Sequence, residues 1–157
     1  MTPTTPRRDP YDTFRPVVGA WVAGGMAVAC VVTFALVAIF SPMPLGSTPA
    51  LSLVNRAGVA LIGVAGAAFL LRYAVLRAVP SRSGLRVVNL FSSRDLEWAQ
   101  IVQVGFSGGA PWAVLELDDT EELAVMAIQR SDGDRARAEA SRLAALIEHH
   151  HRTAGTG

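Results

Sequence analysis

The most prominent pattern in the chain is a long apolar stretch near its N-terminus. Between Arg15 and Arg56 lie forty consecutive residues without an Asp, Glu, Lys, Arg or His, although 27 of the 157 residues are charged. The first part, residues 17–40, contains 24 residues. As a helix it would rise about 36 Å, enough to cross a hydrocarbon core of roughly 30 Å with some tilt. We therefore predict a transmembrane helix over residues 17–40, preceded by a disordered tail over residues 1–16.

A second apolar block, residues 57–71, lies between Arg56 and Arg72 and has only fifteen residues. Because this length would give about 22 Å of helix, a crossing requires apolar residues from both flanks, with the two arginines reaching outward to the interface. We predict a second transmembrane helix over residues 52–74. The segment between the spans, residues 41–51, carries no charge and is rich in proline. We expect it to form a short external loop, which makes the two spans an antiparallel hairpin.

N-terminal targeting signals offer another interpretation of the apolar stretch. A secretory signal has an apolar region of about 7 to 15 residues followed by a cleavage site of small residues, whereas residues 17–40 are longer and no clean Ala-x-Ala follows them. Arg7 and Arg8 form an arginine pair, but residues 9–12 do not continue a twin-arginine pattern. We interpret the stretch as a retained span.

Arginines flank the predicted hairpin unevenly. They gather before the first span and after the second, while the connecting segment has only Arg56 at its end. Positive residues favour the cytoplasmic side, so we expect a multi-pass protein of the cell membrane with both termini in the cytoplasm. Residues 1–79 carry a net charge of +4 and residues 80–157 a net charge of −3. The flanking arginines are Arg7, Arg8, Arg15, Arg72, Arg77, Arg82 and Arg86.

After about residue 76 the continuous apolar pattern gives way to short runs typical of strands. Residues 75–80 are open to two interpretations, as a first strand or as a continuation of the second helix. Val102, Val104 and Phe106 are expected to share one face of their strand. The acids of residues 118–122 favour a solvated hairpin tip between two strands. The expected strands are residues 75–80, 85–91, 101–106, 112–117 and 123–128.

An amphipathic helix is predicted to follow the strands. Ser131 and the aspartates of residues 132–134 favour a helix start, because serine can satisfy free backbone N–H groups and aspartate suits the positive helix end. Apolar residues then recur at helical spacing as far as Ile147. We expect this helix to cover a small antiparallel sheet, and a disordered tail over residues 150–157.

Several phrases in this second half resemble a known family. They are residues 84–89 (GLRVVN), 96–101 (LEWAQI), 110–112 (APW) and 126–129 (MAIQ) with Asp132-Gly133. Together they are similar to the bacterial PH-like domains of actinobacteria, in the group named for a mycobacterial low-molecular-weight protein antigen 6.

The resemblance implies an α+β fold: a two-span transmembrane helical hairpin followed by a small PH-like antiparallel β barrel or sheet, over residues 75–149, capped by a C-terminal α-helix. It implies no enzymatic role, and its motif residues are expected to be structural, with Gly84 in a turn and Trp98 and Trp112 in packing. The sequence departs from the family pattern at residues 118–120, where a turn glycine is commoner, and at Ser92-Ser93, which replaces a more basic loop.

Three features that could carry chemistry are better explained by structural roles. Residues 105–109 match G-x-S-x-G, but Ala110-Pro111 leads into a strand, whereas a nucleophile elbow must lead into a helix. Cys30 is the only cysteine and lies within the first span, so no intramolecular disulfide is available. His149–His151 occur at a helix end without a further ligand set. We expect no catalysis, no cofactor and no metal, and the acidic domain disfavours nucleic acid.

The sequence favours a membrane-anchored interaction or scaffold module that presents the β-domain at the inner leaflet to a protein partner. The alternative is an accessory subunit of a larger membrane enzyme or transporter complex. Small residues in the spans favour close helix packing within the hairpin or a homo-oligomer. Candidate headgroup contacts are Arg72, Arg77, Arg82 and Arg86, the candidate partner surface is Asp118, Asp119, Glu121 and Glu122, and the candidate oligomer contacts are Gly24, Gly25, Gly63 and Gly66.

Overall fold

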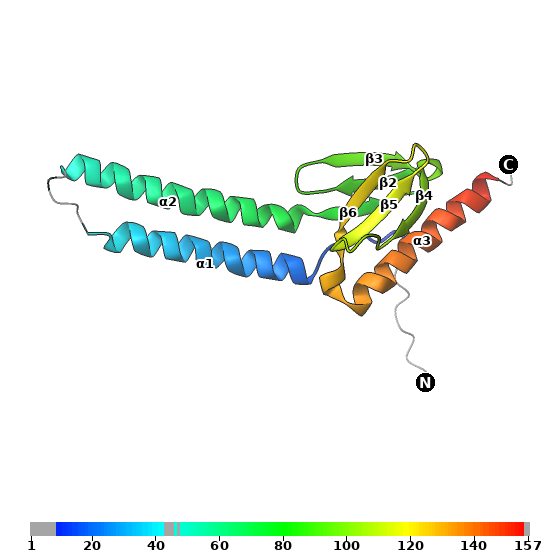
Figure 1. Ribbon diagram of the computed structural model, residues 1–157, viewed down its shortest axis with the longest axis horizontal. Helices are drawn as coiled ribbons and strands as arrows, with labels where there is room; N and C mark the ends of the chain where they lie inside the picture. The colour runs from blue at the N-terminus through cyan, green and yellow to red at the C-terminus, as the bar shows by residue number, and fades with distance from the viewer. Residues whose placement is uncertain (1–8, 43–45, 47, 156–157) are drawn as a thin grey trace, which may run out of the picture. The chain divides into compact units, whose positions relative to one another are not determined.

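The computed structural model describes residues 9–42, 46 and 48–155. Residues 43–45 and 47 of the expected external loop, and the ends of both expected tails, lie outside the described residues. Contacts divide the chain into two compact units, residues 18–74 and residues 1–17 together with 75–157. The architecture confirms the predicted α+β class, with two apolar helices followed by two antiparallel three-stranded sheets and a C-terminal helix (Figure 1).

The first unit is a pair of long helices, α1 (Val18–Phe40) and α2 (Pro49–Leu71). Each has 23 residues, and each is long and apolar enough to cross a membrane. They run antiparallel, since Arg56 near the start of α2 donates to the carbonyl of Ser41 after α1, at 3.3 Å. In the middle of the pair, the Cys30 thiol lies 3.6 Å from the carbonyl oxygen of Gly63.

Helix α2 begins earlier than predicted. Thr48 is its N-cap, and the Thr48 hydroxyl accepts a hydrogen bond from the Leu51 N–H at 3.3 Å, while Pro49 occupies the first helical turn. Proline at this position loses no helical hydrogen bond. The helix therefore includes residues that we had expected in the loop. At its other end it continues as a short 3-10 turn, η1 (Arg72–Val75).

The predicted small-residue contacts divide into two kinds. A Cβ added at Gly63 would lie 2.5 Å from the Cβ of Phe34, and one at Gly66 would lie 3.1 Å from the Cys30 sulfur. These two glycines therefore allow α1 and α2 to approach closely. A Cβ at Gly24 or Gly25 would meet nothing within 4 Å.

The second unit contains two antiparallel sheets of three strands each. In both sheets, strands that are consecutive in sequence are neighbours. The first consists of β1 (Arg77–Pro80), β2 (Gly84–Val88) and β3 (Ser93–Glu97), and the second of β4 (Ile101–Gly105), β5 (Trp112–Leu117) and β6 (Glu122–Gln129). A 3-10 turn, η2 (Trp98–Gln100), connects the two sheets.

Three strand predictions need correction. The strand expected over residues 85–91 ends at Val88 of β2, and residues 89–92 form a loop. Strand β3 was missed because its sequence, SRDLE, is mostly charged, and only Leu96 is buried. An edge strand of this kind shows little of the alternation by which strands are recognised. In β4 the register shifts between Ile101 and Gln103, so Ile101 is fully buried and Val102 is 55% exposed. Val102 therefore does not share a buried face with Val104 and Phe106.

Gly84 has a different role from the one predicted. It lies in β2 rather than at a positive-φ turn position, and a Cβ there would overlap the carbonyl oxygen of Leu96 on β3. Close approach of two backbones explains the glycine at this position.

The C-terminal helix α3 (Asp134–Ala154) lies against the second sheet and is longer than predicted (Figure 1). It follows a 3-10 turn, η3 (Arg130–Asp132), and its N-cap is Gly133 with φ of 60°. Ser131 does not cap α3, since its hydroxyl lies 3.5 Å from the side-chain oxygen of Gln129. The helix runs through residues 150–154, where we had expected a disordered tail.

The core of this unit joins both sheets, α3 and one residue that precedes α1. Leu85 of β2, Leu115 of β5 and Leu143 of α3 are each at most 1% exposed and belong to this core. Phe14 is also 1% exposed and belongs to the same cluster. Residues 9–17 are therefore part of the folded domain, which differs from the predicted disordered tail over residues 1–16.

Candidate functional site

The four candidate headgroup arginines do not form one cluster. Arg72 follows α2, Arg77 begins β1, and Arg82 lies in the turn beyond the other end of β1. A strand of four residues is about 13 Å long, so Arg77 and Arg82 are at opposite ends of the first sheet. Arg86, on β2, lies 3.7 Å from the carboxylate of Asp95 on β3.

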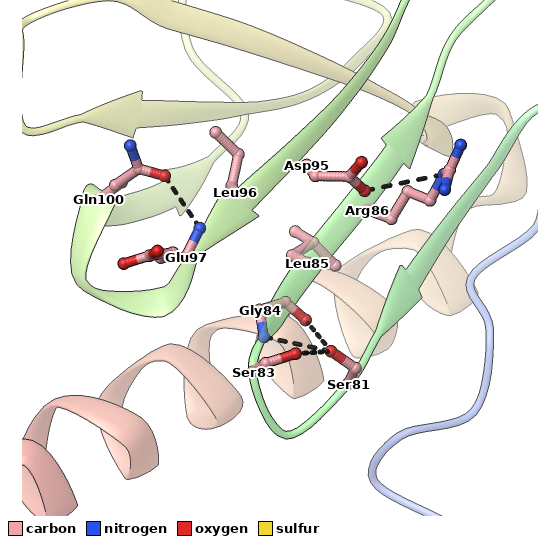
Figure 2. A pocket seen from close by; sticks show the side chains of 9 residues that line it. All are labelled: Ser81, Ser83, Gly84, Leu85, Arg86, Asp95, Leu96, Glu97 and Gln100. Carbon is pink, nitrogen blue, oxygen red and sulfur yellow. Dashed lines mark hydrogen bonds and ion pairs between the residues drawn. The ribbon is translucent and has the colours of Figure 1, made fainter.

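A shallow hollow of about 440 Å³ lies over the β1–β2 turn and the adjoining strands (Figure 2). Its polar groups are engaged with one another, because the Ser81 hydroxyl donates to the Gly84 carbonyl at 2.9 Å and lies 3.1 Å from the Ser83 hydroxyl. Asp95 and Glu97 line the hollow, with Arg86 as its cation. Two carboxylates and one guanidinium do not provide the convergent positive charge that a phosphate group requires.

The acidic β5–β6 hairpin is more structured than a solvated tip. Glu121 forms an ion pair with Arg94 of β3 at 2.7 Å, which raises the pKa of Arg94. The Asp119 carboxylate accepts from the Glu121 N–H at 3.0 Å, and Thr120 adopts a positive φ of 67°. All four candidate partner residues, Asp118, Asp119, Glu121 and Glu122, are exposed, and Glu121 is already paired within the domain.

Sequence reasoning missed the best-defined polar site, which holds the segment before α1 against α3. Arg142 donates to the carbonyls of Pro10 and Asp12, both at 2.9 Å, and pairs with Glu139 at 2.6 Å. Its guanidinium lies 3.8 Å from the ring centre of Phe14. The side chains of Arg142 and Glu139 are only 19% and 12% exposed, so water screens this ion pair less than a surface pair.

Phe14 also extends the first sheet. Its N–H donates to the Ala78 carbonyl at 2.8 Å, and it accepts from the Ala78 N–H at 3.1 Å. The residue therefore forms an antiparallel bridge to β1. The visible signal in the sequence was two aromatic residues, Tyr11 and Phe14, in a polar segment, which does not by itself identify a partner.

A cluster of aromatic rings connects the segment before α1, the η2 turn and the end of α3. His150 stacks on Trp98 with ring centres 4.7 Å apart and an interplanar angle of 4°. The Tyr11 hydroxyl lies 2.9 Å from Nε2 of His150, and Nε2 of His151 lies 3.0 Å from the Trp98 carbonyl. Burial, with smaller contributions from His149 and His151, lowers the pKa of His150. His150 and His151 thus pack against the domain. The part of the chain that the structure describes contains no group of three or more His, Cys, Asp or Glu placed to hold a metal ion.

The G-x-S-x-G segment forms a loop between two strands, as the sequence indicated. The Ala110 N–H donates to the Ser107 carbonyl at 3.0 Å, and the chain then enters β5. Gly108 and Gly109 both have positive φ. Ser107 is exposed and is not followed by a helix, so the surroundings of a nucleophile elbow are not formed at this loop.

Comparison with known proteins finds a family model that matches the part of the chain built from these elements. Residues 76–145 match the family model described as Bacterial PH domain. This match confirms the predicted PH-like character for that part of the chain. It includes all six strands and the first half of α3, and it excludes the segment of residues 9–17 that completes the core.

Curated relatives come from mycobacteria. An uncharacterized protein of Mycobacterium tuberculosis (strain H37Rv) and one of Mycobacterium bovis are each 34% identical to this chain over 93 residues. The alignment covers 59% of this chain, and the chain spans 60% of the length of each relative. No solved structure matches the chain.

Proposed function

We propose that the protein is a membrane-anchored interaction module, in which the α1–α2 hairpin crosses the cell membrane and holds the PH-like domain at the cytoplasmic face. The observation that carries this proposal is the bridge between Phe14 and Ala78. It joins the chain before α1 to the chain after α2 within one folded domain. If both helices cross the bilayer, both ends must therefore emerge on the same side.

The surface of the hairpin supports the membrane part of the proposal. Large apolar side chains are exposed along both helices, among them Val28, Leu61 and Val64, each between 58% and 69% exposed. Such side chains suit contact with lipid better than contact with water. Trp21, 80% exposed, lies one turn into α1, and Tyr73 follows α2, so the antiparallel pairing brings both aromatic residues to the same end of the hairpin. Tryptophan and tyrosine are enriched at membrane interfaces.

The cytoplasmic orientation of that end rests on charge. Arg15 precedes α1 and Arg72 follows α2, whereas Arg56 lies near the opposite end of the hairpin. The bias of arginine toward the domain end favours a cytoplasmic domain. The Trp21 and Tyr73 end would then lie in the inner leaflet.

An interaction role without catalysis is supported by the PH-like fold and by the character of the domain surface. Asp118, Asp119 and Glu122 are exposed on one hairpin, which suits a protein partner with a basic surface. A homo-oligomer through Gly24 and Gly25, whose Cβ positions are open, is the corresponding proposal for the hairpin. Gly63 and Gly66 already serve contacts within the hairpin.

The test separates anchoring from recognition. The intact chain should stay with membranes after alkaline washing, and a chain in which an unrelated two-span hairpin replaces residues 18–74 should do the same. A photo-crosslinking amino acid at Asp118 should capture the same protein in both chains. Capture should be lost when Glu122 is changed to Lys, and the matched charge reversal Glu148→Lys on α3 should leave it intact. Loss of capture on replacing the hairpin would instead favour contacts made by the spans.

A further inference from the structure

One end of the first sheet is tied to both long helices through very short segments. Val17, the residue before α1, donates its backbone N–H to Asp132 at 3.1 Å, so the domain extends along the chain to the residue that precedes that helix. Phe14 is only four residues from Val18, a distance of at most about 14 Å along an extended chain. On the other side, β1 begins at Arg77, six residues after α2 ends at Leu71.

Strand register places one loop at this same end. Arg77 is opposite Val88 on β2, and Val88 is opposite Ser93 on β3. The β2–β3 loop, residues 89–92, is therefore level with Arg77, the first residue of β1. The β1–β2 turn, which contains Arg82, lies at the far end of the same strands.

The β2–β3 loop is fixed by hydrogen bonds to β6 and carries an exposed aromatic ring. Asn89 is 7% exposed, and its side chain donates to the Ala124 carbonyl at 2.7 Å and accepts from the Met126 N–H at 3.2 Å. The Asn89 N–H also donates to the Ser92 carbonyl at 2.8 Å. Phe91 lies between these fixed points and is 81% exposed. Because the loop backbone is already ordered, binding through the Phe91 side chain would cost little conformational entropy.

Basic side chains occupy the same end. Arg77 is exposed on β1, and Arg15 is exposed one residue after the Phe14–Ala78 bridge, where the antiparallel direction leads toward Arg77. An exposed aromatic ring with nearby arginines is the combination by which peripheral segments contact an anionic lipid surface.

We propose that the β2–β3 loop is a membrane-contacting element, in which Phe91 enters the interfacial region of the leaflet next to the hairpin and Arg15 and Arg77 lie at the headgroups. The proposal rests on the proposed function, since it requires α1 and α2 to cross the bilayer. Lipid is the expected partner of the loop because the short connections on both sides keep this end of the sheet close to the membrane. Arg82 and the hollow beside it then face away from the lipid.

Depth-dependent quenching in the intact chain tests this arrangement. The chain, with Cys30→Ser, is reconstituted in vesicles of phosphatidylglycerol and phosphatidylethanolamine that contain nitroxide-labelled lipid. A fluorophore is attached to one cysteine at a time: Ser92→Cys beside Phe91, Arg82→Cys at the far end, and Val64→Cys in α2. We expect loss of fluorescence at position 92 with a headgroup-level nitroxide, little loss at position 82, and loss at position 64 with a nitroxide deep in the acyl chains.

A second substitution assigns the effect to the aromatic ring. Phe91→Ser should reduce quenching at position 92, and the matched change Val102→Ser, which removes an exposed apolar side chain from β4, should leave it unchanged. Quenching at position 64 without quenching at position 92 would overturn the inference and leave the proposed function standing. A position 92 shielded from water but not quenched by lipid would show that protein covers the loop, which also overturns it. Absence of deep quenching at position 64 would contradict the proposed function itself.

Discussion

Phe14 and Ala78 exchange both of their backbone hydrogen bonds, at 2.8 and 3.1 Å, although two long apolar helices separate them along the chain. The hairpin is therefore an insertion within the domain rather than an anchor that precedes it. A domain defined from the family match alone, residues 76–145, lacks three core residues, Phe14, Leu146 and Ile147.

Phe14→Ala is expected to destabilise the domain by about 3 kcal/mol, because it removes a fully buried aromatic side chain and leaves a cavity. Pulse proteolysis of the intact chain in vesicles, over a series of urea concentrations, measures this change. Asp12→Ala is the matched control, since Asp12 contributes its backbone carbonyl and its side chain is exposed. Equal stability of the two variants would mean that residues 9–17 are not part of the cooperative unit.

Arg142→Lys is expected to cost about 2 kcal/mol. Lysine keeps the charge but cannot bond the Pro10 and Asp12 carbonyls and Glu139 at once, as the planar guanidinium does. Arg137→Lys on the same helix is the control, because Arg137 is 79% exposed and its ion-pair partner, Asp134, is exposed as well. That change should stay within about 0.5 kcal/mol. If both changes have the same small effect in urea unfolding, the bonds of Arg142 to Pro10, Asp12 and Glu139 contribute nothing to stability.

Stability should fall as the pH falls below about 6.5, the usual pKa of histidine. Because burial lowers the pKa of His150 in the folded domain, the unfolded chain takes up the proton at a higher pH than the folded domain does. The stabilisation is therefore present above pH 6.5 and is lost as the pH falls toward the folded-state pKa. Urea midpoints between pH 5 and pH 8 measure this slope. His150→Gln should flatten it and Glu148→Gln should not, and an unchanged slope in His150→Gln would remove His150 as its source.

Thr120→Gly is expected to stabilise the domain by about 1 kcal/mol. Thr120 has a φ of 67°, a conformation that is strained for a β-branched residue and free of strain for glycine. Thermal unfolding of the intact chain in detergent measures the change. Asp118→Gly, at a neighbouring position without a positive φ, should be neutral or destabilising. A loss of stability in Thr120→Gly would show that contacts of the threonine side chain outweigh the strain.

Sequence patterns were sufficient for elements whose burial is local and periodic. The two apolar helices, the β5 and β6 strands and the apolar face of α3 follow from residues that alternate or recur along the chain itself. The family resemblance also pointed to the β5–β6 turn, because it marked residues 118–120 as lacking a common glycine. The positive φ of Thr120 shows why a glycine is common in this turn.

Elements fixed by distant partners could not be predicted in this way. Phe14 is ordered by Ala78 and by Arg142, whose bond to the Asp12 carbonyl connects residues 130 positions apart. The last turns of α3 are held by Trp98 through His150 and His151. Because their own sequence is polar, these contacts could not be recognised from it, and a disordered tail was predicted. Gly84 is required by the backbone of β3, a strand whose own charged sequence concealed it. In each case the deciding contact comes from another part of the chain.

The central claim is that the hairpin crosses the membrane and that the domain lies on the cytoplasmic side. Labelling of single cysteines in intact cells with a membrane-impermeant maleimide tests it directly, in a chain with Cys30→Ser. Ala50→Cys, exposed at the start of α2, should react in intact cells, whereas Ser107→Cys, exposed on the domain, should react only after the membrane is permeabilised. Reaction of Ser107→Cys in intact cells, or protection of both positions until permeabilisation, would contradict the account.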